Sequence, residues 1–233
     1  MTKTLMVLQH HEAEGIGRIG LWAKQHQWQV ISHMAPELFT QLGQHPATFD
    51  RQWRQQIAQV DGLIILGGPT NVQDNPPWMA IERQCIRIAL AEHLPIFAIC
   101  LGAQLVAAEL GAQIKPLAKA ELGWQSIDFT HADSPSIKVL QWHEYGFEFS
   151  PTQHNNIAIE ASSQGWPQQI YRLPKVMGVQ FHPEWDLAQI GKLKQAFGQT
   201  CPFDLSSKAS EQATIEHWLF NQLDQLFIGQ ASG

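Results

Sequence analysis

The chain has 233 residues, a formal net charge of −6, 44% hydrophobic residues and 15% charged residues. This composition excludes a chain that is disordered throughout, and the length is sufficient for one large α/β domain with a sizeable core. Because nucleic acids and anionic membranes bind clustered Lys and Arg, the acidic balance argues against both and favours a small-molecule substrate.

The cysteines and the N-terminus indicate the compartment. Cys85, Cys100 and Cys201 form an odd set without regular spacing, which excludes a disulfide framework and a CxxC metal site. The first residues run directly into polar and acidic positions and do not form a signal peptide. No apolar run approaches the roughly 18 residues that a membrane span needs. We therefore expect a cytoplasmic protein with no cofactor.

The first half of the chain alternates short strands with helices. Each predicted strand is a brief, continuous apolar run, which is typical of a strand buried on both faces. The alternation predicts βαβ units and a parallel sheet. The predicted strands are 4–9, 29–32, 62–66 and 94–99, and the predicted helices are 16–26, 49–59 and 78–92.

The second half has more strands in succession, which indicates antiparallel or mixed pairing. Its predicted strands are 124–130, 138–142, 157–161, 169–173 and 176–181, and its predicted helices are 187–197 and 210–228. The whole pattern predicts one α/β domain over residues 1–233, with an open, mostly parallel but mixed, twisted sheet and helices on both faces. Its core spans about residues 4–198, followed by a C-terminal helix at about 208–228.

Cys100 is the sharpest candidate for chemistry. A buried strand ends at this residue and turns directly into a helix, which is the layout of a nucleophile elbow with sulfur in place of the usual serine oxygen. At a helix N-terminus, unpaired N–H groups and the positive end of the dipole favour the thiolate. The alternative is a small buried hydrophobic residue, which is the usual role of a free cysteine.

A base and an orienting group follow another predicted strand. His182, Pro183 and Glu184 come directly after strand 176–181. Residues two apart in an extended segment point the same way, and proline keeps its predecessor extended. Glu184 is therefore expected beside His182, where it would fix the histidine tautomer. Taken alone, the tripeptide is also compatible with an ordinary strand exit.

Gly67, Gly68 and Pro69 follow a third buried strand. Two glycines there allow backbone N–H groups to approach a ligand closely, as an oxyanion hole requires, although an ordinary turn is the alternative. Because the carboxyl ends of parallel strands share one edge of a sheet, all three motifs are expected to converge.

Two other motifs look like ligand sites but fit poorly. Residues 15–20 have GxGxxG spacing, yet residues 10–14 separate them from the strand, and no acidic residue closes the next strand. The His-Glu pairs at 11–12 and 143–144 lack the second histidine of a zinc HExxH motif. Neither dinucleotide nor metal binding is implied.

Three segments share their order and spacing with a known family. They are Gly67-Gly68-Pro69, Ile99-Cys100-Leu101-Gly102-Ala103-Gln104 and Gly178-Val179-Gln180-Phe181-His182-Pro183-Glu184. Together they resemble the class I glutamine amidotransferase domain, the glutaminase part of GMP synthase. Residues 121–124 and 142–143 extend the likeness to about residues 5–197. The resemblance implies a flavodoxin-like fold and hydrolysis of glutamine to glutamate and ammonia.

The resemblance also implies the roles of individual residues. Cys100 is the nucleophile, His182 the general base and acid, and Glu184 its orienting partner. The remaining implied residues are the oxyanion-hole donors Gly68 and Leu101 and the substrate contacts Gly67, Gln104 and His143. Two departures from the family are Ala98, where glycine is common, and residues 143–147, where the synthase has a His-Gly-Asp segment.

Three functions remain open at this point. The chain contains no P-loop and leaves no room after residue 197 for an ATP-using synthetase domain, which favours a free-standing amidotransferase that passes ammonia to a separate synthetase subunit. The second function, a γ-glutamyl hydrolase or peptidase, would use the same thioester chemistry on larger amides. The third is a non-catalytic regulatory protein on the same fold, although an intact Cys, His and Glu set argues against it.

Overall fold

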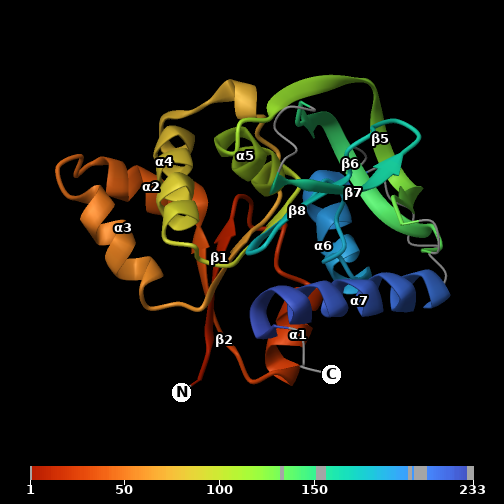
Figure 1. Cartoon of the computed structure of the whole chain (residues 1–233), viewed down its shortest axis with the longest axis horizontal. Coiled ribbons are helices and arrows are strands. Elements are labelled where there is room, and N and C mark those ends of the chain that lie inside the picture. The colour runs from red at the N-terminus through yellow and green to blue at the C-terminus, as the bar shows by residue number, and fades with distance from the viewer. Residues whose placement is uncertain (1, 132–133, 151–155, 199–200, 202–208, 230–233) are drawn as a thin grey trace.

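The computed structural model describes residues 2–131, 134–150, 156–198, 201 and 209–229. These residues form a nine-stranded sheet with helices on both faces (Figure 1). The strands are β1 (Thr4–Gln9), β2 (Gln29–Met34), β3 (Gly62–Ile65), β4 (Ile96–Ile99), β5 (Gln113–Phe129), β6 (Ile137–Glu148), β7 (Ala158–Ser163), β8 (Ile170–Leu173) and β9 (Val176–Val179).

The helices lie between these strands and at the end of the chain. They are α1 (Arg18–Gln25), α2 (Ala35–Gly43), α3 (Phe49–Ile57), α4 (Pro77–Ala91), α5 (Leu101–Glu109), α6 (Leu187–Phe197) and α7 (Ala209–Leu223). A short 3-10 turn, η1 (Val72–Asp74), precedes α4, and a π-helical turn, η4 (Asp224–Ile228), follows α7. Among the described helices, none is both long and apolar enough to cross a membrane.

The sheet has a parallel half and an antiparallel half. Its strand order is β2-β1-β3-β4-β9-β8-β7-β5-β6. The first five of these strands pair in parallel, and the remaining pairings are antiparallel. The predicted mixed, mostly parallel sheet is therefore confirmed. β9 returns from the antiparallel half to pair with β4, so that Ala98 lies beside Gly178.

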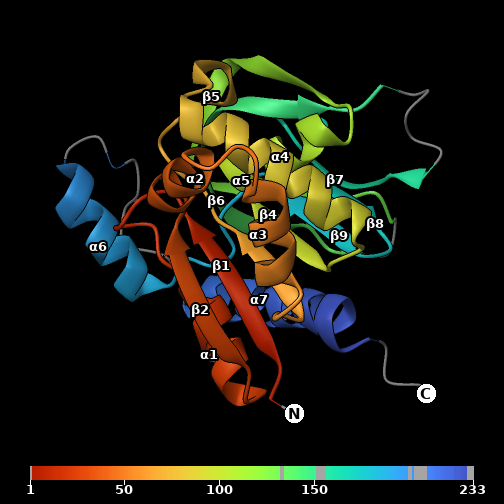
Figure 2. The same ribbon diagram turned by 90° about the vertical axis from the view of Figure 1, so that its left-hand side faces the viewer.

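Alternate residues of the central strands feed two separate cores. Met6 and Leu8 of β1 point to the face covered by α2, α3, α4 and α5, whereas Leu5 and Val7 point to the face covered by α1 and α7. The turn of the molecule in Figure 2 shows α7 behind the sheet and α2 to α4 in front of it. Because both faces are buried, the strands read as continuous apolar runs rather than alternating ones.

One helix was not predicted from the sequence, and one strand is longer than predicted. Helix α2 follows β2 without any turn residue between them, and Pro36 in its first turn opens it while Phe39 and Leu42 enter the core. Strand β5 begins well before the predicted start at residue 124. It buries only Glu121 and Ile127 along its length, so its outer part carries no apolar pattern.

The C-terminal helix agrees with its prediction in the described residues, where α7 and η4 together cover residues 209–228. Residue 208, the first of the expected span, lies outside them. Helix α6 has the predicted bounds, opened by an Asp186 side chain that accepts a hydrogen bond from the Gln189 backbone N–H.

Gly102 tests the close packing of α5 against β3, and Gly191 in α6 provides the control. A Cβ at Gly102 would lie 2.3 Å from the carbonyl oxygen of Ile65, and this backbone atom cannot move aside, so Gly102→Ala is expected to lower the free energy of unfolding by more than about 2 kcal/mol. Gly191 in α6 has no atom within 4 Å of its Cβ position. Gly191→Ala is therefore expected to raise stability by about 0.5–1 kcal/mol. Urea unfolding of both variants measures the two signs, and equal effects would contradict the packing described.

Candidate active site

Four adjacent strands bring the sequence-predicted residues to one edge of the sheet. β1, β3, β4 and β9 are parallel neighbours, so the loops after them meet at their carboxyl ends. These loops and residues of β6 line a pocket of about 280 Å³. The lining includes six predicted site residues, namely Gly68, Cys100, Leu101, Gln104, His143 and His182.

Cys100 occupies a strained turn between β4 and α5. Its backbone has φ 50° and ψ −111°, a left-handed conformation that non-glycine residues rarely adopt. The Cys100 N–H donates to the Val179 carbonyl at 2.9 Å, which ties the turn to β9. The side chain lies at the N-terminus of α5 and is 6% exposed. The elbow expected from the sequence is therefore present.

His182 and Glu184 form a buried pair beside the cysteine. His182 Nδ1 lies 2.8 Å from Glu184 Oε1, and the ring stacks on Trp185 with centroids 3.5 Å apart and planes 10° from parallel. Burial alone lowers the pKa of His182, but the Glu184 carboxylate and the Cys100 sulfur, by charge and hydrogen bonding, raise that pKa to about 10. Because Nδ1 is held by Glu184, the other ring nitrogen is the one that meets Cys100.

The backbone of Glu184 is fixed by the start of α1. Arg18 donates its backbone N–H to the Glu184 carbonyl at 2.8 Å, and its guanidinium donates to the carbonyls of Pro183 and Trp185. Gly17 has φ 44°, and a Cβ there would lie 2.0 Å from the Glu184 carbonyl oxygen. Residues 15–20 therefore support the histidine loop, which explains a glycine of the GxGxxG spacing without any nucleotide.

The glycines after β3 make room for the other groups. A Cβ at Gly67 would lie 2.7 Å from His182 Cε1, and one at Gly68 would lie 3.2 Å from Leu101 Cδ2. In the described part of the chain, the backbone N–H groups of Gly68 and Leu101 have no hydrogen-bond partner. Both residues line the pocket with Cys100, and unpaired backbone N–H donors are what an oxyanion hole requires.

His10, directly after β1, holds the Gly67–Gly68 loop in place. Its Nδ1 lies 3.0 Å from the Leu66 carbonyl and 3.1 Å from the Gly67 carbonyl, and its Nε2 lies 3.1 Å from Glu82 Oε1. Burial lowers the pKa of His10, but the Glu82 charge and these hydrogen bonds outweigh it and raise that pKa. Since carbonyl and carboxylate oxygens only accept hydrogen bonds, both ring nitrogens donate and the ring is an imidazolium.

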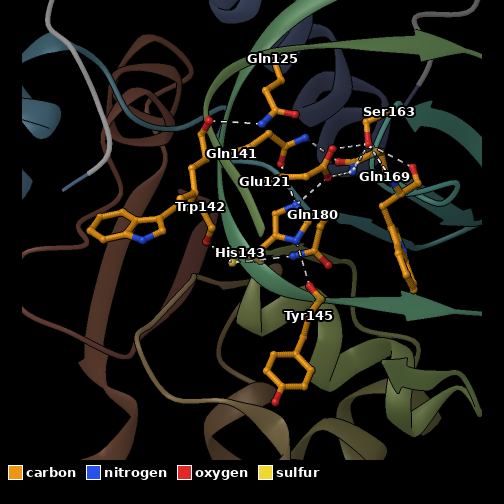
Figure 3. A network of polar contacts seen from close by, with 12 residues as sticks. Glu121, Gln125, Gln141, Trp142, His143, Tyr145, Ser163, Gln169 and Gln180 are labelled. Carbon is orange, nitrogen blue, oxygen red and sulfur yellow. Dashed lines mark hydrogen bonds and ion pairs between the residues drawn. The ribbon is translucent and has the colours of Figure 1, made fainter. Parts of the chain in front are cut away.

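A buried polar network extends from Cys100 into the antiparallel half of the sheet. Figure 3 shows its labelled members, among them Gln180, Gln141 and Glu121. Gln180 Nε2 and the Trp142 carbonyl each lie 3.8 Å from Cys100 Sγ. Gln104, which lines the pocket, donates from Nε2 to the Tyr145 carbonyl at 2.8 Å and to Gln180 Oε1 at 3.3 Å.

His143 lies inside this network. Its Nδ1 is 2.9 Å from the Tyr145 carbonyl, and its Nε2 is 3.0 Å from Glu121 Oε2 (Figure 3). Burial raises the pKa of Glu121, but hydrogen bonds from His143, Ser163 and Gln169 outweigh it and hold that pKa below its usual range. Although His143 lines the pocket, both its ring nitrogens are held by the protein.

Glu14 adds a carboxylate that the sequence reasoning did not select. It lies in the loop after β1, lines the pocket and is 6% exposed. Burial and the Glu184 charge raise the pKa of Glu14 to about 7, against the opposing charges of His182 and His10. His10 and Glu14 follow a buried strand just as Gly67, Cys100 and His182 do, so the same rule would have found them. Among the described residues, no group of three or more His, Cys, Asp or Glu could hold a metal ion.

Comparison with known proteins identifies the family. The sequence model of the family "Glutamine amidotransferase class-I" matches residues 26–194. The chain belongs to this family.

GMP synthases are among the curated relatives of this class I amidotransferase chain. It is 26% identical over 180 residues to a subunit of the glutamine-hydrolyzing GMP synthase of Thermoplasma volcanium, which covers 74% of the chain and 83% of that protein. It is 26% identical over 133 residues to the corresponding subunit from Picrophilus torridus, covering 55% and 69%. Against the glutamine-hydrolyzing GMP synthase of Porphyromonas gingivalis, 26% identity covers 67% of the chain but 30% of the relative.

Solved structures of similar fold span the whole chain. A glutamine amidotransferase from Thermotoga maritima superposes with a TM-score of 0.80 at 18% identity, covering 97% of this chain and 99% of that one. A glutamine amidotransferase from Methylobacillus flagellatus gives a TM-score of 0.78 at 22% identity, covering 100% and 98%. The class I amidotransferase fold expected from the sequence is confirmed.

The strain at Cys100 predicts an unusual order of stability among variants of this amidotransferase chain. Glycine adopts a positive φ without steric cost, whereas alanine keeps the strain. Cys100→Gly is therefore expected to exceed Cys100→Ala in free energy of unfolding by about 1 kcal/mol. Chemical denaturation of both variants measures the difference. A less stable glycine variant would show that the turn carries no strain.

The pKa of Glu14 predicts a pH-dependent stability. The folded-state pKa, about 7, lies above the ordinary value of 4.5, so stability from this group is present at low pH and lost as the pH rises through 7. Glu14→Gln removes the cost of burying the ionised carboxylate. Its advantage in free energy of unfolding over the wild type is expected to grow by about 2 kcal/mol from pH 5 to pH 8. Glu12→Gln, an exposed change in the same loop, should show no such trend.

Proposed function

We propose that this chain is a glutaminase that hydrolyses the side-chain amide of glutamine to glutamate and ammonia through a thioester on Cys100. The observation that carries the proposal is the arrangement of Cys100 at a strained strand-to-helix turn, against a buried histidine whose other nitrogen is bound to Glu184. A nucleophile, its base and the partner that orients the base are the parts such a reaction needs.

In the first half-reaction, the Cys100 thiolate attacks the γ-carbonyl carbon of glutamine. The carbonyl oxygen becomes an oxyanion that accepts hydrogen bonds from the free N–H groups of Gly68 and Leu101. The carbon–nitrogen bond then breaks as His182 gives its proton to the nitrogen, and ammonia leaves. Glu184 keeps the histidine ring in the tautomer that this transfer requires, and Trp185 supports the cationic ring through its face.

In the second half-reaction, water attacks the thioester. His182, now neutral, takes a proton from that water, and the carbon–sulfur bond breaks to release glutamate and restore the thiolate. After one turnover the enzyme is again in its starting state, with a Cys100 thiolate and a protonated His182.

The proposed substrate contacts differ in kind. Gly67 contributes by having no side chain, because any Cβ would enter the space of the His182 ring. Gln104 lines the pocket, while its side-chain nitrogen is held by the Tyr145 carbonyl. His143 lines the pocket with both nitrogens held by the protein, so we assign it the support of the neighbouring wall.

The names of the relatives support the proposed partner. Two of them are named as single subunits of GMP synthase, and the GMP synthase of Porphyromonas gingivalis extends well beyond the matched region. We infer that the ammonia is used by a separate synthetase subunit, and that the chain acts as a single domain in the cytoplasm.

Release of glutamate and ammonia from purified protein tests this function. We expect turnover of glutamine to exceed that of a panel of γ-glutamyl peptides, and Cys100→Ala to reduce turnover by at least about 10⁴-fold, because no thioester forms without the thiol. Cys201→Ala is the matched control and should keep full activity. Preference for the peptides would identify a γ-glutamyl hydrolase instead. Activity that survives Cys100→Ala would reject the site, and a lack of all turnover would favour a regulatory protein.

A further inference from the structure

Among the described pocket residues, Glu14 carries a carboxylate that the mechanism above does not use and that nevertheless faces the reacting atoms. Its Oε2 lies 3.1 Å from the Cβ position of Gly67, a point that is also 2.7 Å from His182 Cε1 and 3.4 Å from Cys100 Cβ. The carboxylate, the histidine ring and the cysteine therefore surround the same small volume.

The loop that carries Glu14 is fixed, but the carboxylate itself is not bound. Gln9 Nε2 donates to the carbonyls of His11 and Glu12 at 2.9 and 3.2 Å, and the Gln189 side chain donates to the Ala13 carbonyl. In the described part of the chain, neither oxygen of Glu14 has a hydrogen-bond or ion-pair partner. An unpartnered carboxylate at 6% exposure, open to a pocket, is costly unless a ligand uses it.

Several charges face Glu14 from the neighbouring elements. The His182 imidazolium after β9 and the His10 imidazolium after β1 attract its negative charge, and Glu184 repels it. Glu82 on α4 is paired with His10 and reduces the pull of that ring. Neither histidine forms a hydrogen bond to Glu14, so the carboxylate can still accept one from a donor in the pocket, and it favours a donor that gains positive charge. The departing nitrogen gains such charge when it is protonated.

We propose, resting on the glutaminase function above, that the Glu14 carboxylate is a further catalytic residue that accepts a hydrogen bond from the leaving nitrogen of the substrate amide. The nitrogen gains positive character as His182 transfers its proton to it while the carbon–nitrogen bond breaks. An N–H of that nitrogen donates to Glu14, which takes no proton. Ammonia then leaves, and atoms and charges balance as in the mechanism without Glu14.

This role fits the leaving group and not the glutamyl part of the substrate. The carboxylate lies beside the histidine that protonates the leaving nitrogen, next to the bond that breaks. A carboxylate that bound the α-ammonium of glutamine would lie at the far end of the substrate, several bonds away from His182.

Two substrates that differ only in the leaving group separate these roles. Glutamine releases ammonia, whereas glutamate γ-methyl ester releases methanol, which develops no comparable positive charge. Glu14→Gln keeps the size of the side chain and removes its charge. We expect it to lower kcat/KM for glutamine by about 10- to 100-fold, the effect of losing one charge-assisted hydrogen bond, and that for the ester by less than about threefold.

Glu12→Gln is the matched control, because it is the same substitution in the same loop at an exposed position. It should leave both substrates unchanged. Retained ester turnover in Glu14→Gln also shows that the site is folded. An equal loss on amide and ester would overturn the proposal, since a structural or α-ammonium-binding carboxylate affects both alike. A wild type that turns over neither substrate would reject the glutaminase function itself, and the role of Glu14 with it.

The pH profile gives a second readout. Since the pKa of Glu14 is about 7, wild-type kcat/KM for glutamine is expected to rise with pH through 7 as the carboxylate ionises. The ratio of amide to ester turnover should show the same rise in the wild type and in Glu12→Gln, and be flat in Glu14→Gln. A rise that persists in Glu14→Gln would assign the ionisation to another group and overturn the proposal.

Discussion

The arrangement of the whole site depends on the space that a side chain at Gly67 would fill, because His182, Glu14 and Cys100 surround this space. β3, β4 and β9 are hydrogen-bonded neighbours, and such strands lie about 4.8 Å apart, so the residues that follow them are forced into contact. A methyl group at Gly67 would lie 2.7 Å from His182 Cε1, so the histidine ring would have to shift to make room for it. The pairing of the sheet and the absence of one side chain together bring the sulfur and the imidazole within reach of each other.

In the part of the chain that the structure describes, three buried histidine–carboxylate pairs surround the pocket, and they differ in one respect. His10 is paired with Glu82 and His143 with Glu121, and in both rings the remaining nitrogen is bound by a backbone carbonyl. The His10 ring holds the Gly67–Gly68 loop in place, and the His143 ring holds the β6 backbone at Tyr145. In the pair of His182 with Glu184, the remaining nitrogen meets Cys100 instead. Two of the three histidine–carboxylate pairs therefore support the backbone, whereas the third places a ring nitrogen beside a cysteine, as the proposed proton transfer requires.

Much of the site could be predicted from sequence because its residues directly follow buried strands. The strand at Thr4–Gln9 and the helix at Leu187–Phe197 match their predicted bounds. Continuous apolar runs and helical periodicity are local signals, so they can be read from neighbouring residues alone. The start of β5 was not predictable, because its outer residues are exposed and its partner is distant in sequence. The partners of His143 were missed because a contact with Glu121 depends on hairpin register, which no local pattern specifies.

The residues that line the pocket fall into two groups, a floor and a rim. Its floor consists of backbone N–H groups, glycines and a residue with φ 50°, where almost any new side chain collides or strains. Its rim consists of less deeply buried side chains such as Thr70, Tyr145 and the exposed Glu144. Substitutions are therefore expected to be tolerated at the rim and rejected at the floor, so variants that differ in the compounds they bind should differ in rim residues while the backbone of the floor stays the same.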